Sequence, residues 1–198
     1  MHYRKGLILC EGGTEERYFK AMTEHLQLKG QLIDVTTEIY KPKDHSPRGL
    51  IREAKKRINK IKELEQPAHD FVWLVFDKDD HPGIAGTFNE AAAYNGTPEL
   101  KIAFTSACFE FYILLHFERT TKPFRNCAET IKHLKRHLPD YEKSANLYKE
   151  LYRYRRTAFA NCEFVMKQAR YDMERGLKPY ELAAYCNVHE LEYFLEQL

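Results

Sequence analysis

The sequence lacks the features that mark membrane-spanning, secreted and disulfide-rich proteins. Its 198 residues contain no apolar run of about 18 residues, the minimum for a membrane span. A polar and basic segment, His2 to Lys5, precedes the first expected strand, where a secretory signal would be apolar. The five cysteines are widely spaced without a Cys-x-x-Cys pair, which argues against a disulfide framework or zinc ribbon. We therefore expect a cytoplasmic protein with reduced cysteines and no membrane partner.

The chain has almost no net charge, because 31 basic residues are balanced by 29 acidic ones, but the charges are unevenly distributed. Seven Lys and Arg against three acids lie between residues 48 and 65, and eight against three lie between 132 and 156. Such positive segments suit DNA or RNA. In the second segment, arginines among tyrosines offer contacts to phosphates and bases, although a solvated helix face is an equal interpretation. The candidate nucleic-acid-binding residues are Lys149, Arg153, Arg155 and Arg156.

Two apolar segments end in acidic residues. The segment 71–76 is followed by Asp77, Asp79 and Asp80, and the segment 7–10 is followed by Glu11 and Glu15. Two unit charges about 4 Å apart repel by roughly 4 kcal/mol at an effective dielectric near 20, so such acids call for a cation or a raised pKa. Oxygen ligands of this kind suit Mg²⁺. The other interpretation is a solvated turn at 77–80 and a carboxylate stabilised by a helix N-terminus at Glu11.

The periodicity predicts an α/β fold with a mainly parallel four-stranded sheet flanked by helices. The strands are expected at 6–10, 32–40, 71–76 and 101–105, with helices between them. In such sheets, ligands gather beyond the carboxyl ends of the strands, so Glu11 and the acids after residue 76 are expected to converge. From residue 123 onward the pattern is helical only. We therefore predict a core over 1–120 and a helical extension over 121–198 that packs on it as one compact unit.

Three motifs resemble a known family. They are Glu11-Gly-Gly-Thr-Glu15, Val75-Phe-Asp77-Lys-Asp79-Asp80-His81, and Ser106 followed by Phe109-Glu110-Phe-Tyr-Ile-Leu-Leu-His116-Phe117. In this order they resemble the RloB family, whose core is a Toprim-type domain. A fainter likeness extends to Asn187-Val-His189-Glu-Leu191 near the end of the chain.

The resemblance implies a site for Mg²⁺ (or Mn²⁺) that carries out phosphodiester chemistry. Glu11 matches the first acidic position, Asp77 and Asp79 match the second, and Asp80 stands as an additional ligand. The resemblance also implies a role in phage defence or restriction, often with an RloA-like ATPase partner.

The residues themselves assign further roles around this site. Asp77 and Asp79 are two apart in extended chain and so face one crevice as metal ligands, and Glu11 is either a ligand or a general acid or base. Glu15 is a candidate catalytic residue, with stabilisation by the helix dipole as the alternative. Glu110, in an apolar helix, requires a partner if it is buried. We place it with Ser106 and His116 around the site, although a histidine in this position is more often a core residue.

These features predict a metal-dependent nuclease that acts on DNA or RNA. The main alternative is a regulator of the same fold that binds nucleic acid or the ATPase without catalysis. A third interpretation, a phosphohydrolase with Asp77 as nucleophile, fits less well because that motif ordinarily ends the first strand of its fold. His133 and His137, four residues apart among basic neighbours, are expected to face water. The sequence leaves the polymer, its sequence preference and the oligomeric state open.

Overall fold

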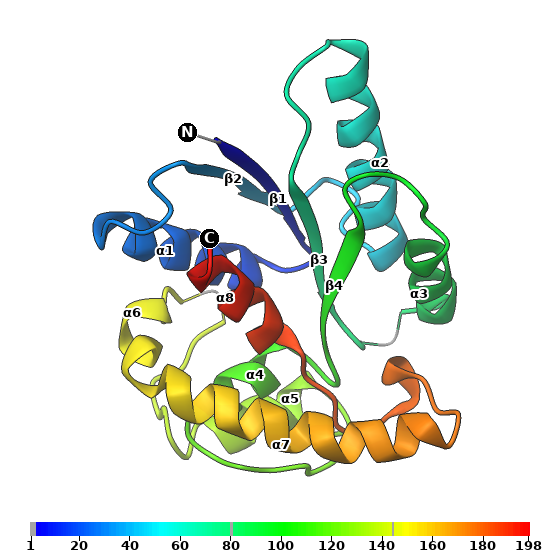
Figure 1. The fold of residues 1–198 in the computed structure, drawn as a ribbon. Helices are drawn as coiled ribbons and strands as arrows, with labels where there is room; N and C mark the ends of the chain where they lie inside the picture. The colour runs from blue at the N-terminus through cyan, green and yellow to red at the C-terminus, as the bar shows by residue number, and fades with distance from the viewer. Residues whose placement is uncertain (1–2, 80, 144) are drawn as a thin grey trace.

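The computed structural model describes residues 3–79, 81–143 and 145–198. Its centre is a four-stranded sheet with the strand order β2-β1-β3-β4, in which every neighbouring pair is parallel (Figure 1). The strands are β1 (Arg4–Cys10), β2 (Val35–Tyr40), β3 (Phe71–Asp77) and β4 (Leu100–Thr105). The predicted α/β fold with a parallel four-stranded sheet is confirmed, and the arrangement is consistent with a Toprim-like fold.

Helices cover both faces of this sheet. In the first two thirds of the chain they are α1 (Gly13–Leu28), α2 (Pro47–Glu63), α3 (Ile84–Ala92) and α4 (Phe109–Leu115). The remainder is helical, with α5 (Cys127–Leu134), α6 (Tyr148–Leu151), α7 (Arg155–Glu174), α8 (Val188–Glu196) and the 3₁₀ turns η1 (Tyr152–Tyr154) and η2 (Pro179–Glu181). Helices α2 and α3 lie on one side of the sheet and α1 with α8 on the other (Figure 1). No helix of the described residues is both long enough and apolar enough to cross a membrane.

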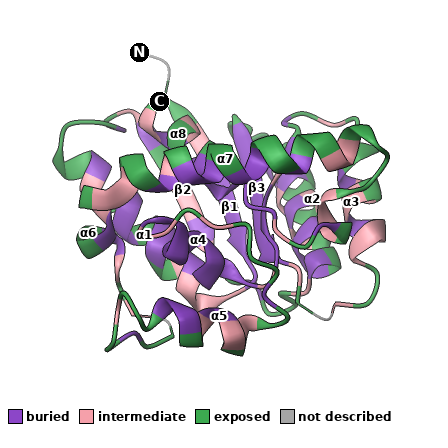
Figure 2. Cartoon of the chain, turned by 90° about the horizontal axis from the view of Figure 1, so that it is seen from below, coloured by how far each residue is buried: buried purple, intermediate pink, exposed green. Residues whose placement is uncertain are grey.

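The two central strands divide their side chains between two hydrophobic cores. Every residue of β3 is buried, as its continuous apolar run indicates for a central strand (Figure 2). Alternate residues such as Trp73 and Val75 pack towards α1 and α4, whereas Val72 and Leu74 pack towards α2. By the same alternation Asp77, the last residue of β3, faces the side of α1 and α4. The strand periodicity therefore selects the face on which this carboxylate lies.

The C-terminal helices share these cores and close the free edge of β4. The Ser106 amide donates to the Tyr185 carbonyl at 2.8 Å, and the Phe104 amide donates to Asn187 Oδ1 at 2.7 Å. Asn187 Nδ2 in turn donates to the Ile102 carbonyl at 3.0 Å. The segment after residue 120 is therefore tied to the sheet through backbone groups, while a domain boundary near that residue stays a prediction.

The cysteines differ from the expectation. Cys108 and Cys127 form a disulfide, with their Cα atoms 5.4 Å apart, so the prediction that all cysteines are reduced is wrong for this pair. The pair is 19 residues apart in sequence and meets because α4 and α5 begin side by side, which no local spacing reveals. The other cysteines, Cys10, Cys162 and Cys186, are buried and unbridged in the structure.

Candidate functional site

The acids after β1 and β3 lie together at the carboxyl edge of the sheet, because these two strands are neighbours. The Glu11 amide donates to the Val75 carbonyl at 2.9 Å, which extends the β1–β3 pairing by one residue. The Asp77 amide then donates to Glu11 Oε2 at 3.1 Å. The two carboxylates thus meet through the backbone geometry of a parallel sheet, as the sequence pattern predicts.

His81 completes this group, although sequence reasoning did not select it. Its Nε2 lies in close contact with Glu11 Oε1. One ligand atom from each of Glu11, Asp77 and His81 lies within 4.8 Å of the others, a spacing that a single metal ion can bridge. The only sequence signal was the position of His81 directly after the acidic run, in a turn without hydrophobic periodicity.

Asp77 carries an unsatisfied charge-bearing atom. Its residue is 8% exposed, and its Oδ1 is buried without a hydrogen-bond partner among the described residues. Burial raises the pKa of this carboxyl well above its ordinary value, and the nearby charges of Glu11 and Glu15 raise it further. A buried carboxylate oxygen without a partner is costly, and a bound cation removes that cost. The orphaned oxygen and the donors beside it therefore fit a divalent metal ion.

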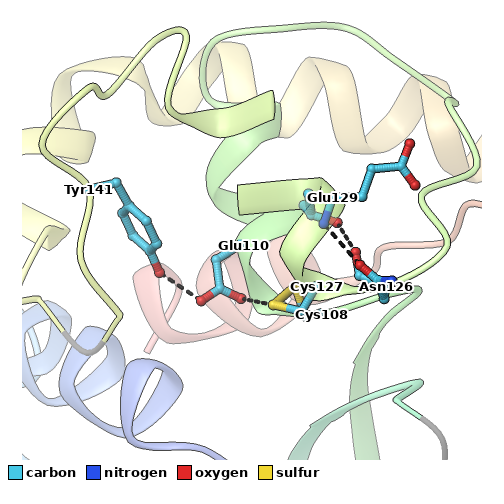
Figure 3. The surroundings of a disulfide bond; sticks show 7 residues. Cys108, Glu110, Asn126, Cys127, Glu129 and Tyr141 are labelled. Atoms are coloured by element: carbon cyan, nitrogen blue, oxygen red, sulfur yellow. Dashed lines mark hydrogen bonds between the residues drawn. A yellow bond between two sulfur atoms is a disulfide. The ribbon is translucent and has the colours of Figure 1, made fainter. Parts of the chain in front are cut away.

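Glu15 and Glu110 are two further buried acids close to this group. Glu15 lies in the first turn of α1 and is 3% exposed. Burial raises its pKa to about 7, with further contributions from the charges of Glu110 and Glu11. A Cβ at Gly12 would meet the Glu15 carboxylate, so a larger residue there would push this side chain out of its present position. Glu110 Oε1 accepts a hydrogen bond from the Tyr141 hydroxyl at 2.7 Å, which gives this buried acid the partner that it requires (Figure 3).

These residues line one cavity of about 300 Å³, which we call the acidic cavity. Its described acids are Glu11, Glu15, Asp77, Asp79 and Glu110, and its basic lining consists of Lys41, His45, His81 and Lys143. Asp79 is exposed and has a positive φ of 20°, a value that places its backbone at a sharp turn after β3. Asp80, expected as a further ligand, lies outside the described residues. The cavity has an acidic majority, which favours a cation over an anion as its first occupant.

Ser106 and His116 do not line this cavity. Ser106 Oγ donates to the Leu182 carbonyl at 3.2 Å and so ties the end of β4 to the C-terminal segment. His116 is 1% exposed, with Nδ1 3.1 Å from the Tyr112 carbonyl. Burial lowers its pKa to about 4, which keeps the imidazole neutral near pH 7. In the structure both residues have packing and hydrogen-bonding roles.

The basic run of the second positive segment lies at the opposite end of α1 from the acids. Lys29, which follows α1, donates to the Tyr152 hydroxyl at 2.9 Å, and Arg155 Nε lies 3.4 Å from Glu196 Oε1. Sixteen residues of helix span about 24 Å, so this run is remote from Glu15 at the start of α1. The residues placed there are Lys149, Arg153, Arg155 and Arg156.

Of the two histidines expected to face water, His137 is exposed, but His133 in α5 is buried. The Nε2 atoms of His133 and His137 lie 2.9 Å and 3.1 Å from Glu118 Oε2. His133 is 9% exposed, so the expectation that it faces water is wrong. Its neighbours in sequence are basic, but the packing of α5 against α4 turns this one side chain inward.

Comparison with known proteins identifies one family. No curated protein and no solved structure matches the chain. One family model, described as RloB-like protein, matches residues 6–193 and so spans the sheet, the acidic cavity and the C-terminal helices. Because the match covers nearly all of the sequence, the chain belongs to the RloB-like protein family.

Proposed function

We propose that this protein is a metal-dependent nuclease with a Toprim-type site, which hydrolyses phosphodiester bonds of DNA or RNA. The observation that carries the proposal is Asp77 Oδ1, a buried carboxylate oxygen without a described partner, beside the donors of Glu11 and His81. Carboxylates suit Mg²⁺, and a set of carboxylates with one imidazole also suits Mn²⁺. Asp79 lines the same cavity and is the further ligand available to this ion. Asp80 keeps this proposed role on the sequence pattern alone.

The chain supplies proton-transfer groups next to these ligands. A bound ion polarises a phosphate and lowers the pKa of bound water. Glu15, with a pKa near 7, exchanges a proton readily at neutral pH and is the candidate general acid or base. Glu11 is held by the Asp77 amide, so its carboxylate orientation is fixed before any ligand arrives. Lys143 lines the same cavity and therefore places one cation where it can contact a phosphate group. Its charge also lowers the pKa of Glu15.

A cleavage assay with matched variants tests this proposal. Purified protein is incubated with plasmid, single-stranded DNA and tRNA in Mg²⁺, Mn²⁺ or EDTA. We expect cleavage that requires the metal and that falls at least a hundredfold in Glu11→Gln and in Asp77→Asn. Glu174→Gln is the matched control, because Glu174 is exposed at the end of α7 and outside the acidic cavity. Cleavage that persists in Asp77→Asn would refute the assignment.

The alternative function is a regulator that binds nucleic acid or an ATPase without cleaving anything. The tight contact between His81 and Glu11 favours it, because the histidine ring already occupies a carboxylate oxygen that a metal ion would otherwise take. Nucleic-acid binding without cleavage in any metal would support this role. We further propose, from the family resemblance, a place in anti-phage defence with an RloA-like ATPase partner. A pull-down with a purified RloA-like ATPase tests this.

A further inference from the structure

A basic groove leads away from the acidic cavity. Asp79, which lines the acidic cavity, also lines a second depression of about 270 Å³ whose far wall is the segment 123–126. Arg125 and Asn126 of that wall also line a third depression of about 370 Å³. The three depressions therefore adjoin one another through shared residues. Step by step, they lead from the acids to the residues of α5.

The far part of this path is strongly positive. Its basic lining residues, which define the basic groove, are Lys122, Arg125, Lys132 and Arg136. Glu129 is the single acid among the lining residues, and its carboxylate lies 3.7 Å from both Lys122 Nζ and Arg125 Nε. Lys132 and Arg136 form no ion pair with any residue that the structure describes. Most of this positive charge is thus not neutralised within the protein.

The groove is held in place before any ligand binds. Asn126 caps α5, since its Oδ1 accepts from the Glu129 amide at 2.9 Å (Figure 3). Glu129 Oε2 in turn accepts from the Arg125 amide at 3.0 Å. The next residue, Cys127, is bonded to Cys108 at the start of α4. The Arg125 side chain nevertheless remains 89% exposed. A fixed backbone thus presents a guanidinium to solvent, which lowers the ordering cost of phosphate binding.

The more distant basic run contrasts with this groove. Arg155 is engaged by Glu196 and stacks on the Tyr152 ring, with its guanidinium 4.2 Å from the ring centroid. That run also lies at the other end of α1 from Glu15. If the bond is cut at the acidic cavity, cations close to that cavity hold the polymer better than remote cations do. Their contacts with neighbouring phosphates also orient the reacting phosphate.

We propose that the basic groove binds the phosphodiester backbone of the nucleic-acid substrate and directs it into the acidic cavity. Arg125 contacts the phosphate nearest the cavity, and Lys132 and Arg136 contact phosphates farther along the strand. This inference rests on the proposed nuclease function for its substrate, but it makes a separate statement about binding. It places the polymer on Arg125 and on the start of the second positive segment, at Lys132 and Arg136, and not on the candidate residues Lys149 to Arg156.

Two triple variants of equal charge test it. Arg125→Gln/Lys132→Gln/Arg136→Gln removes three cations from the basic groove, and Lys149→Gln/Arg153→Gln/Arg156→Gln removes three exposed cations from the remote run. Binding to fluorescein-labelled single-stranded DNA, duplex DNA and tRNA is measured by anisotropy in EDTA, so that no cleavage intervenes. Circular dichroism and thermal melting verify that both variants fold.

We expect the groove variant to lose at least tenfold in affinity. Its slope of log K against log salt should fall by about 2, because each phosphate contact to a single strand contributes roughly 0.7. The remote variant should change affinity less than threefold. Equal losses in the two variants, or a larger loss in the remote one, would overturn the proposal. If binding depends on the basic groove but no cleavage occurs in Mg²⁺ or Mn²⁺, the groove proposal is supported and the nuclease proposal is refuted. If the protein cleaves nucleic acid but its binding does not depend on the basic groove, the nuclease proposal is supported and the groove proposal is refuted.

Discussion

Glu15 makes the stability of the metal-free protein depend on pH in a way that one substitution removes. Its folded-state pKa of about 7 stands above the ordinary value of 4.5. Between these values the folded protein retains a proton that the unfolded chain has lost, so the free energy of unfolding falls as the pH rises. A difference of about 2.5 pH units corresponds to about 3 kcal/mol. Glu15→Gln cannot titrate, so this contribution is absent from the variant.

Urea denaturation of the metal-free protein measures the effect. The stability of Glu15→Gln relative to the wild type should increase by about 3 kcal/mol from pH 4.5 to pH 7.5. Glu192, whose pKa is also about 7, contributes equally to both proteins and cancels in the comparison. Glu174→Gln, at an exposed position, should follow the wild type at every pH. If the wild-type and Glu15→Gln stabilities instead change in parallel, the inferred burial cost of the Glu15 charge is wrong.

The remaining predictions concern the metal ligand, the disulfide and the buried acid of α8. Excess Mn²⁺, at about 100 times its dissociation constant, should stabilise the wild type by about 2.7 kcal/mol in thermal melting but leave Asp77→Asn unchanged. Equal shifts in both proteins would place the ion elsewhere. Dithiothreitol should lower the free energy of unfolding by about 3 kcal/mol in urea titrations, because Cys108 and Cys127 close a loop of moderate length. It should not affect the Cys108→Ser/Cys127→Ser protein. An unchanged wild-type midpoint would contradict the bond. Glu192→Leu should destabilise the fold by about 2 kcal/mol at pH 5. The hydroxyls of Tyr18 and Tyr112 both donate to Glu192 Oε1 at 2.5 Å and would lose their acceptor in this variant. A variant as stable as the wild type in a urea titration would argue against this network.

The sheet and its two carboxylates follow from short stretches of the chain. The apolar run at 71–76 indicates a central parallel strand, and the structure buries each of its residues. At the start of α2, Pro47 is the first helical residue and the Gly49 amide donates to Ser46 Oγ at 3.1 Å, a cap made by neighbouring residues. Glu11 and Asp77 meet because the parallel order of the sheet fixes where strand ends lie. Such features depend on periodicity and capping, which operate over a few residues.

Other parts of the site depend on contacts between distant segments. His81 stands in a turn whose path no periodicity specifies, and only the folded chain brings it to Glu11. The Cys108–Cys127 bond and the approach of Arg125 to the acidic cavity both depend on how α5 packs against α4. Composition alone favoured the arginines after residue 152, but α1 separates them from the acids.

The sequence by itself therefore determined the fold class and the carboxylates at the ends of β1 and β3. Local hydrophobic patterns fix which face of an element is buried, and strand direction fixes where its last residue lies. Only the tertiary structure decided which histidine joins the carboxylates, which cysteines are bonded and which basic surface adjoins the acidic cavity. These outcomes depend on the packing of elements far apart in the chain, and that packing is set by the shapes of whole surfaces.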